Sequence, residues 1–375
     1  MIDNKFLAST MTVTTRSSNL ELYRILIMLL IVAHHYVVNS GLFDVMNEDV
    51  LCANTTFFSL FGAWGKTGIN CFLLITGYFM CKSNISLRKF LRLILWVVTY
   101  NILITVIFII GGGNTPKEIL HMIFDAIPFR VIDSSHFTTC FVFFYLSIPF
   151  LNIILNNLSK RWHQWLIILM LIIYTLHGSI PKVMGVSMNY VSWFSVLYFI
   201  AAYLRLYPIK DGNTKFWGVA TLISFAISSI GILLLNYLQV KFGIEAKVQY
   251  SYMLVQDSNA LLALINGITS FMWFKSIKLR NSKVINTIAA SAFGVLLIHA
   301  NSNAMRQWLW YDTVNCMGHF DTPYYWAYAI GCVLAIYVVC TLIDYIRIKT
   351  IETPLLNATE RVCYWVRDKF VKIYN

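Results

Sequence analysis

The sequence predicts an all-α polytopic membrane protein with about ten transmembrane helices and with its N- and C-termini in the cytoplasm. Three observations lead to this fold class. The chain of 375 residues is 58% hydrophobic, only 12% of it is charged, and long apolar runs follow one another through most of its length. Soluble domains are usually about 25% charged, so a chain with so little charge could not cover its own surface in water.

Ten apolar runs are long enough for membrane-spanning helices, each of which needs about 20 residues. The runs lie near residues 20–40, 60–80, 91–112, 138–156, 163–180, 190–207, 216–238, 258–275, 285–305 and 324–345. They are continuous rather than built of short alternating segments, which excludes a transmembrane β-barrel. We therefore expect a cytoplasmic N-terminal segment at residues 1–18 and a single transmembrane domain at residues 19–346.

The Lys and Arg residues predict the orientation of this domain. With the N-terminus inside, 21 of the 29 Lys and Arg residues fall in cytoplasmic segments, and only 6 fall in the opposite loops. This asymmetry is typical of the positive-inside rule and places both termini in the cytoplasm. It also explains the net charge of +12. The expected surroundings are the lipids of the cell's inner (plasma) membrane, and we predict no nucleic-acid partner.

The third predicted segment is a cytoplasmic tail at residues 347–375. Val362, Val366, Phe370 and Ile373 recur there at helical spacing, with Arg and Lys between them. Such a pattern is typical of an amphipathic helix that lies along the inner surface of a membrane.

The first apolar run carries ionisable residues that a bilayer does not tolerate without a reason. It reads ELYRILIMLLIVAHHY over residues 21–36. Arg24 and His35 are eleven steps of about 100° apart, which is three turns plus about 20°, so they share one helix face about 16 Å apart along the axis. Glu21 lies on the same stripe, and His34 lies to its side.

These residues have two interpretations. Arg24 near the helix end could extend its guanidinium to the lipid headgroups, with Glu21 as its partner. That interpretation does not explain His35, which lies more than one turn from the opposite end. Ionisable groups at such depth usually face a cavity or a partner and mark a functional site. We therefore predict a functional role for His35 and a weaker one for His34.

Six segments, in this order, resemble the acyltransferase-3 family of integral-membrane acyltransferases. RILIMLLIVAHH is similar to the family's Arg-x10-His signature, and the 66–80 segment is similar to FFxxSGY, with Thr76 in place of Ser. Thr138 stands where the family usually has Trp in its HFWF segment. The similar segments are KTGINCFLLITGYFM (66–80), HFTTCFVFFYLSIPFLN (136–152), LYFIAAYLRLY (197–207), FGVLLIH (293–299) and IDYIRIKTIETPL (343–355).

The resemblance implies a ten-helix bundle that transfers an acyl group from acyl-CoA, usually acetyl-CoA, to a sugar hydroxyl. The expected acceptor is a surface polysaccharide or a lipid-linked glycan of a bacterial envelope. Acyl-CoA is expected as a donor substrate, with no bound cofactor. The eight cysteines show no CxxC and no metal-ligand spacing, so no metal site is predicted. The acyl group, the sugar and the oligomeric state stay open.

The family also has an Arg-x-x-Arg element after its second helix. This chain has Lys89-x-x-Arg92 there, with Arg88 adjacent. The phosphates of CoA are confined to the cytoplasm, so a donor site must be basic and must open inward. We expect Arg88, Lys89 and Arg92 to bind acyl-CoA through charge-assisted contacts, although ordinary positive-inside charge would explain them as well.

His35 is the predicted catalytic base, because a histidine can take a proton from a hydroxyl near neutral pH. A covalent acyl-histidine is the rival route. Arg24 would hold the donor or stabilise negative charge, with Glu21 orienting it. Further pocket candidates follow from polar positions at helix ends or beside a packing glycine; they are His34, Tyr78, His136 and His299.

Two other functions fit the same composition. A transporter or flippase of a lipid-linked glycan would also need a polar stripe inside a helical bundle. The sequence argues against it because apolar segments broken by Gly or Pro do not occur in paired halves. A scaffold subunit of a polysaccharide synthase is the third possibility, and labelling of an acceptor from an acyl thioester separates the enzyme from both.

Overall fold

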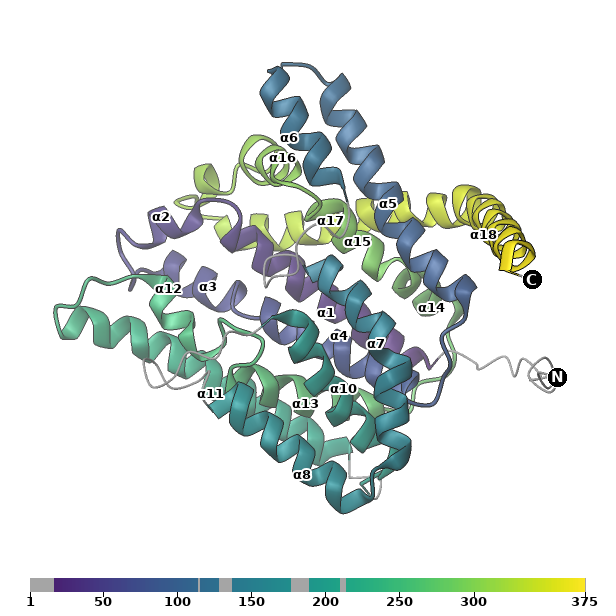
Figure 1. The fold of residues 1–375 in the computed structure, drawn as a ribbon. Coiled ribbons are helices and arrows are strands. Elements are labelled where there is room, and N and C mark those ends of the chain that lie inside the picture. Colours follow the sequence, from purple (N-terminus) through teal and green to yellow (C-terminus); the bar gives the residue numbers. More distant parts are fainter. Residues whose placement is uncertain (1–16, 114, 128–136, 177–188, 210–213, 375) are drawn as a thin grey trace.

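Helices form the regular structure in the described part of this computed structural model (Figure 1), and no strand occurs there. The described residues are 17–113, 115–127, 137–176, 189–209 and 214–374, with side chains to residue 368. The all-α fold class is therefore confirmed. The longer helices are α1 (Ser18–Val38), α4 (Gly65–Met80), α5 (Leu87–Ile110), α6 (Pro116–Ala126), α7 (Phe137–Asn157), α8 (Lys160–Leu171), α10 (Tyr190–Leu206), α11 (Thr214–Lys241), α13 (Leu261–Ser276), α17 (Tyr325–Arg347) and α18 (Thr353–Tyr374). Shorter ones are α2 (Leu42–Met46), α3 (Ala53–Phe61), α12 (Val248–Ser251), α14 (Lys283–Ala290), α15 (Ala292–His299) and α16 (Asn303–Arg306).

Six helical segments of the described chain are long and apolar enough to cross a membrane. They are Ser18–Val38, Ala53–Met80, Leu87–Ile110, Phe137–Asn157, Thr214–Lys241 and Tyr325–Asp368. The pair Lys283–His299 and Asn303–His319 is a seventh if the two pieces form one span. Nine of the ten predicted runs each lie mainly on one helix over their described residues, but three of these helices, α8, α10 and α13, are not among the candidate spans. Ten crossings therefore stay a prediction.

α1 lies at the centre of the bundle (Figure 1), where it contacts α4, α13, α14, α15 and α17. It is buried on several sides, as shown by Ile27, Val32 and Tyr36, whose side chains are shielded from solvent. α4 approaches closely because it presents a glycine: a Cβ built at Gly68 would lie 2.8 Å from Cγ1 of Ile31. Small residues allow such close packing where neighbouring helices cannot rely on the exclusion of water.

The remaining helices form a second layer on this core. α10 packs against α4, α7 and α8, and α11 packs against α13. Asn70 of α4 joins α4 to α10 and to the segment before α13, since its amide donates to the carbonyl of Ser258 at 2.7 Å and its carbonyl accepts from Trp193 Nε1 at 2.9 Å. The layer fixes α4, and α4 in turn fixes the side of α1 that carries His34.

The predicted helix at residues 285–305 is not one straight element, which corrects that part of the sequence prediction. α15 ends at His299, and the chain bends by 96° before Asn303. The cause is local: Asn301 donates its side-chain amide to the carbonyl of Leu297 at 3.0 Å, and Ser302 accepts from the backbone of Met305 at 3.2 Å and so caps a new helix. The break therefore needs neither Gly nor Pro.

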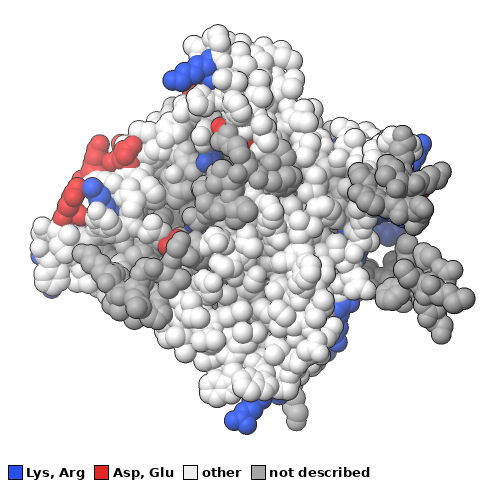
Figure 2. All heavy atoms as spheres, in the orientation of Figure 1, with Lys and Arg blue, Asp and Glu red and all other residues white. Residues whose placement is uncertain are grey.

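The two ends of the bundle differ in charge. The basic end, where α1 and α5 begin and α17 ends, carries Arg24, Arg88 and Arg92. The opposite end, where α1 finishes with His34 and His35, is called here the histidine end. Figure 2 shows acidic side chains gathered beside α2 at the histidine end, whereas basic side chains lie along the opposite edge. The orientation of these ends in a membrane stays a prediction.

The C-terminal segment continues α17 through a π-helical turn, η6 (Ile348–Glu352), into α18, which packs on α5. The predicted helix in the tail is thus present at residues 353–374. Its position along a membrane surface stays a prediction. What the structure adds is that α18 lies against the helix that carries Arg88 and Arg92 (Figure 1).

We expect Gly77→Ala to destabilise the bundle by about 1–3 kcal/mol, the usual cost of overpacking a tight core. The added Cβ would lie 2.8 Å from the Cβ of Ala201 and 3.2 Å from the Cα of Tyr198, and neither atom can move without its backbone. Thermal unfolding of the purified protein in detergent measures the effect. The matched control is Gly331→Ala, whose Cβ would meet nothing within 4 Å. Equal unfolding temperatures for the two variants would contradict close α4–α10 packing.

Candidate functional site

Two histidines from helices that are far apart in the sequence meet inside the bundle. His35 Nδ1 of α1 and His299 Nε2 of α15 are 2.9 Å apart, and His299 Nδ1 lies 2.6 Å from the carbonyl oxygen of Val295. A carbonyl oxygen only accepts, so His299 Nδ1 must donate to it. In neutral His299 the Nε2 atom is then an acceptor, and His35 Nδ1 donates to it. Nε2 of His35 is then the unprotonated nitrogen, and no partner for it occurs among the described residues, so it can accept a proton.

The two members of this pair differ in exposure. His299 is completely buried, whereas His35 is only partly buried. His299 therefore has no face left for a small molecule, and it serves to fix the tautomer and direction of the His35 ring. The predicted pocket role of His299 becomes a supporting role for the more accessible histidine.

His34 has a different environment from its neighbour. Its Nδ1 lies 2.5 Å from the carbonyl oxygen of Gly62, to which it donates. Its ring also occupies the space that a side chain at position 65 would need, so Gly65 is required there. His34 thus anchors α1 to the start of α4, and its place beside the polar stripe agrees with the helical phase expected from sequence.

Glu21 and Arg24 form the predicted pair at the other end of the stripe. Arg24 Nη1 lies 3.3 Å from Oε1 of Glu21, which is buried, while Arg24 is partly exposed. Because α1 is an unbroken helix from Ser18 to Val38, Arg24 and His35 stay about 16 Å apart along its axis. The two side chains cannot act on the same atom of a substrate.

The three predicted donor-binding residues point in two directions. Arg88 forms an ion pair with Glu360 and donates to Asn357 Oδ1 at 2.9 Å. Arg92 Nε lies 3.0 Å from Oε1 of Glu352. Lys89 instead donates to Ser83 Oγ at 3.2 Å and to a loop carbonyl. The structure therefore joins both arginines to the C-terminal segment and separates Lys89 from them.

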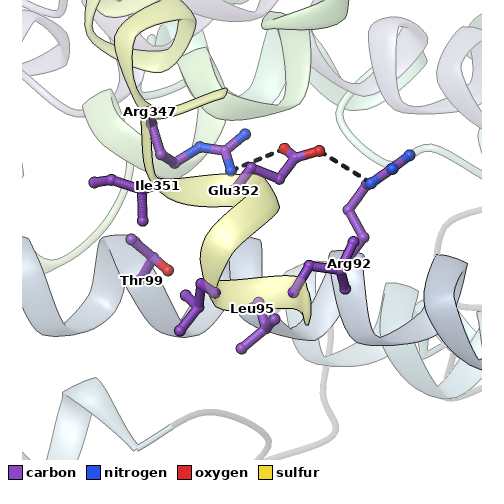
Figure 3. Close-up of a pocket in the computed structure, with 8 residues that line it drawn as sticks. Arg92, Leu95, Thr99, Arg347, Ile351 and Glu352 are labelled. Carbon is purple, nitrogen blue, oxygen red and sulfur yellow. Dashed lines mark hydrogen bonds and ion pairs between the residues drawn. The ribbon is translucent and has the colours of Figure 1, made fainter. Parts of the chain in front are cut away.

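A pocket lies where Arg92 meets the C-terminal segment (Figure 3). It is lined by Arg92, Leu95, Thr99, Arg347, Ile351, Glu352, Leu355 and Leu356. The carboxylate of Glu352 lies between two guanidinium groups, since its other oxygen accepts from Arg347 Nη1 at 3.0 Å. Two arginines held around one carboxylate form an arrangement that also suits a phosphate group.

Sequence reasoning missed the buried half of this network. Asp344 and Arg347 of α17 are both buried, and Asp344 Oδ1 accepts from Arg347 Nε at 2.8 Å. The same oxygen accepts from Trp96 Nε1 at 3.0 Å and from Tyr100 OH at 2.8 Å. The available signal was the DYIR stretch, an acid and a base one helical turn apart at the end of an apolar run. The network positions α5 against α17.

Tyr78 belongs to the basic end rather than to the histidines. Its hydroxyl accepts from Arg205 Nη1 at 2.8 Å, and its ring lies under both that guanidinium and the ammonium of Lys275. Tyr78 therefore lies at the basic end, away from His35 and His299. His136, the remaining candidate, lies outside the described residues.

Two cations that the sequence analysis did not single out lie at the histidine end. Lys66 of α4 and Arg306 of α16 lie within electrostatic range of His35. Lys66 donates to Tyr190 OH at 2.9 Å. The polar side chains of Asn101 and Asn301 meet at the same end, 3.2 Å apart. The histidine end is thus a polar, cationic site within an apolar bundle.

The described part of the chain contains no candidate metal-binding site. No group of three or more His, Cys, Asp or Glu side chains is placed there as metal ligands would be. The arrangement at His35 is instead suited to proton transfer or nucleophilic attack, because one ring nitrogen is held and the other is free.

A comparison with known protein families gives a match over most of the chain. A family model described as an acyltransferase domain, of the acyltransferase-3 type, matches residues 17–344. The match covers most of the chain and includes Glu21, Arg24, His35 and His299, but it ends before Arg347 and Glu352. Neither the curated proteins nor the solved structures gave a match.

We expect Asp344→Ala to destabilise the protein by about 3–5 kcal/mol, because it leaves Arg347 buried without its charge partner. Thermal unfolding in detergent measures this loss. The control is Asp368→Ala, which breaks the exposed ion pair of Arg367 and Asp368 and should cost less than about 1 kcal/mol. Similar losses in the two variants would contradict a structural role for the buried network.

Proposed function

We propose, from the premise that the chain belongs to the acyltransferase-3 family, that it transfers a short acyl group from acyl-CoA to a sugar hydroxyl. Acetyl is the expected acyl group, and the acceptor is a surface polysaccharide or a lipid-linked glycan. The enzyme would work in the cell's inner membrane, with the basic end facing the cytoplasm. Family membership supports the acyltransferase activity itself, and the donor and the acceptor are the proposal.

The observation that carries the proposal is the hydrogen bond from His35 to His299. It leaves Nε2 of His35 as a free acceptor on a partly buried ring, held in one direction by a fully buried partner. A base positioned in this way can take the proton of an acceptor hydroxyl as the oxygen attacks the thioester. The same atom could instead attack the thioester itself and form an acyl-histidine, so the sequence-based alternative stays open.

The donor would enter from the basic end. Arg88 and Arg92 are partly exposed there, which suits contacts with the phosphates of CoA. Their present partners, Glu360 and Glu352, are carboxylates that a phosphate would replace. Arg24, held by Glu21 near the start of α1, lies at the same end of the bundle and would contact the arm of the donor. Roughly 16 Å of α1 separates Arg24 from His35, so only an extended donor can bring its thioester to the base.

We expect His35→Ala to reduce acyl transfer by about 10²–10⁴-fold, the usual contribution of a general base. Membranes with the wild-type or variant protein receive acetyl-CoA labelled in the acetyl group and the glycan fraction of the host. The readout is label in glycan. The matched control is His34→Ala, which removes the adjacent imidazole but leaves the His35–His299 bond, and which should keep most of the activity.

Each outcome of this experiment distinguishes between the possible roles of His35 or between the enzyme and a transporter. Equal labelling by all three proteins would show that His35 is not the base. Labelling by none, with other short acyl-CoAs also silent, would favour the transporter of a lipid-linked glycan, a function for which a broken helix such as α15–α16 is a common element. Label trapped on the wild-type protein and absent from His35→Ala would indicate the covalent route.

We expect His299→Leu to lower kcat by about tenfold or more and to leave KM for acyl-CoA nearly unchanged, because His35 loses the acceptor that fixes its tautomer. His299→Gln is the conservative control, since its amide oxygen can still accept from His35 Nδ1. Steady-state kinetics with the two variants measure the difference. Equal kcat values for Leu and Gln would contradict a positioning role for His299.

A further inference from the structure

Acyl transfer at His35 needs a positive group close to His35 itself. Attack on a thioester places negative charge on the carbonyl oxygen, and enzymes hold donors or cations ready for that charge. Arg24 was the sequence-based candidate, but it lies about 16 Å from His35 along a straight helix. A carbonyl within reach of the base is therefore out of reach of Arg24, and the charge must come from the histidine end.

The described residues offer two cations there. Lys66 and Arg306 both lie within electrostatic range of His35, and Arg306 is also within range of His299. Lys66 is held in place by Tyr190. Lys66 Nζ donates a hydrogen bond to the Tyr190 hydroxyl oxygen at 2.9 Å and lies 5.6 Å from the centroid of the Tyr190 ring. Lys66 is thus a fixed charge with a committed hydrogen bond.

Arg306 is placed differently. It follows the break at residues 300–302, where the chain bends by 96°, so its short helix does not continue along the axis of α15. Its Nε is buried and has no hydrogen-bond partner among the described residues. A buried N–H of a charged guanidinium without an acceptor is costly, and such exceptions call for an explanation. An anionic oxygen that forms only during the reaction would be the missing acceptor and would explain this unpartnered N–H.

The break that positions Arg306 is itself held by side chains. Asn301 donates to Asn101 of α5 at 3.2 Å and to the carbonyl of Leu297 at 3.0 Å, and Trp308 packs edge-on against Phe108 of the same helix. These contacts fix both sides of the bend on α5. Arg306 is therefore supported by a rigid corner next to His299.

We propose that Arg306 is a catalytic residue that stabilises the oxyanion formed beside His35, with Lys66 adding a fixed positive field. This inference rests on the proposed acyl transfer. The acceptor oxygen bonds to the thioester carbon as its proton passes to His35 Nε2, and the carbonyl π electrons move to the oxygen that faces Arg306. Collapse re-forms the carbonyl and breaks the carbon–sulfur bond. The leaving thiolate takes the proton back from His35, which gives CoA as a thiol and a neutral base.

The test compares Arg306→Ala, Arg306→Lys and the wild type, with labelled acetyl-CoA and the host glycan fraction. Loss of an oxyanion donor should lower kcat of Arg306→Ala by about 10²–10³-fold, with KM for acetyl-CoA little changed. Arg306→Lys keeps the charge without the planar fork and should fall between the two. Added methylguanidinium should restore part of the activity of Arg306→Ala, which a purely structural role would not allow.

The matched control is Lys247→Gln, a loop cation whose pKa is raised by its hydrogen bond to Glu245 and which is therefore charged at neutral pH. It removes one positive charge without touching the bend, so its kcat should equal that of the wild type. An equal loss in Lys247→Gln would show that only net charge matters and would overturn the proposal.

Two results separate this inference from the proposed function. If His35→Ala abolishes transfer while Arg306→Ala keeps a near-normal kcat, the base is correct and Arg306 is not the oxyanion residue. If His35→Ala is fully active, acyl transfer at this site fails, and the role of Arg306 fails with it. Should Arg306→Ala not fold, the comparison of Arg306→Lys with Lys247→Gln decides, since only the former should lose kcat.

Discussion

The site depends on a single hydrogen bond between side chains that are 264 positions apart, the one from His35 to His299. It joins α1 to α15 at depth and orients both rings through the carbonyl of Val295. Both imidazoles must be neutral for the chain of donors and acceptors to be complete. The bond therefore fixes the position of the helix, the tautomer of His35 and the chemistry that His35 can perform.

Local physics explains what the sequence could predict. Apolar runs and the 100° step of a helix are properties of neighbouring residues, so the all-α class and the shared face of Arg24 and His35 followed from the printed order. The ion pair of Glu21 and Arg24 is likewise within one turn. The bend after His299 had a local signal in the polar HANSN stretch, which an apolar-run analysis reads as part of a helix.

The remaining features of the site are contacts between residues far apart in the chain, which cannot be predicted from a single sequence. His299 as the partner of His35, and Glu352 and Glu360 as partners of the α5 arginines, arise because helices from opposite ends of the chain lie side by side. The contact of Tyr78 with Arg205 is long-range in the same way. The place of Tyr78 follows from the direction of α4, which runs back from His34 toward the basic end.

Two polar centres at opposite ends of one central helix limit what the bundle can do. A compact substrate would contact the basic end or the histidine end but not both, whereas a donor with a charged head and a long arm would contact both. The ion pairs that cover the arginines at the basic end are partly exposed, and such pairs contribute little, on the order of 0–1 kcal/mol. A polyphosphate can therefore displace the tail carboxylates at small cost. The buried pair of Asp344 and Arg347 meanwhile holds α5 and α17 in place, so binding of the proposed donor need not disturb the histidine end.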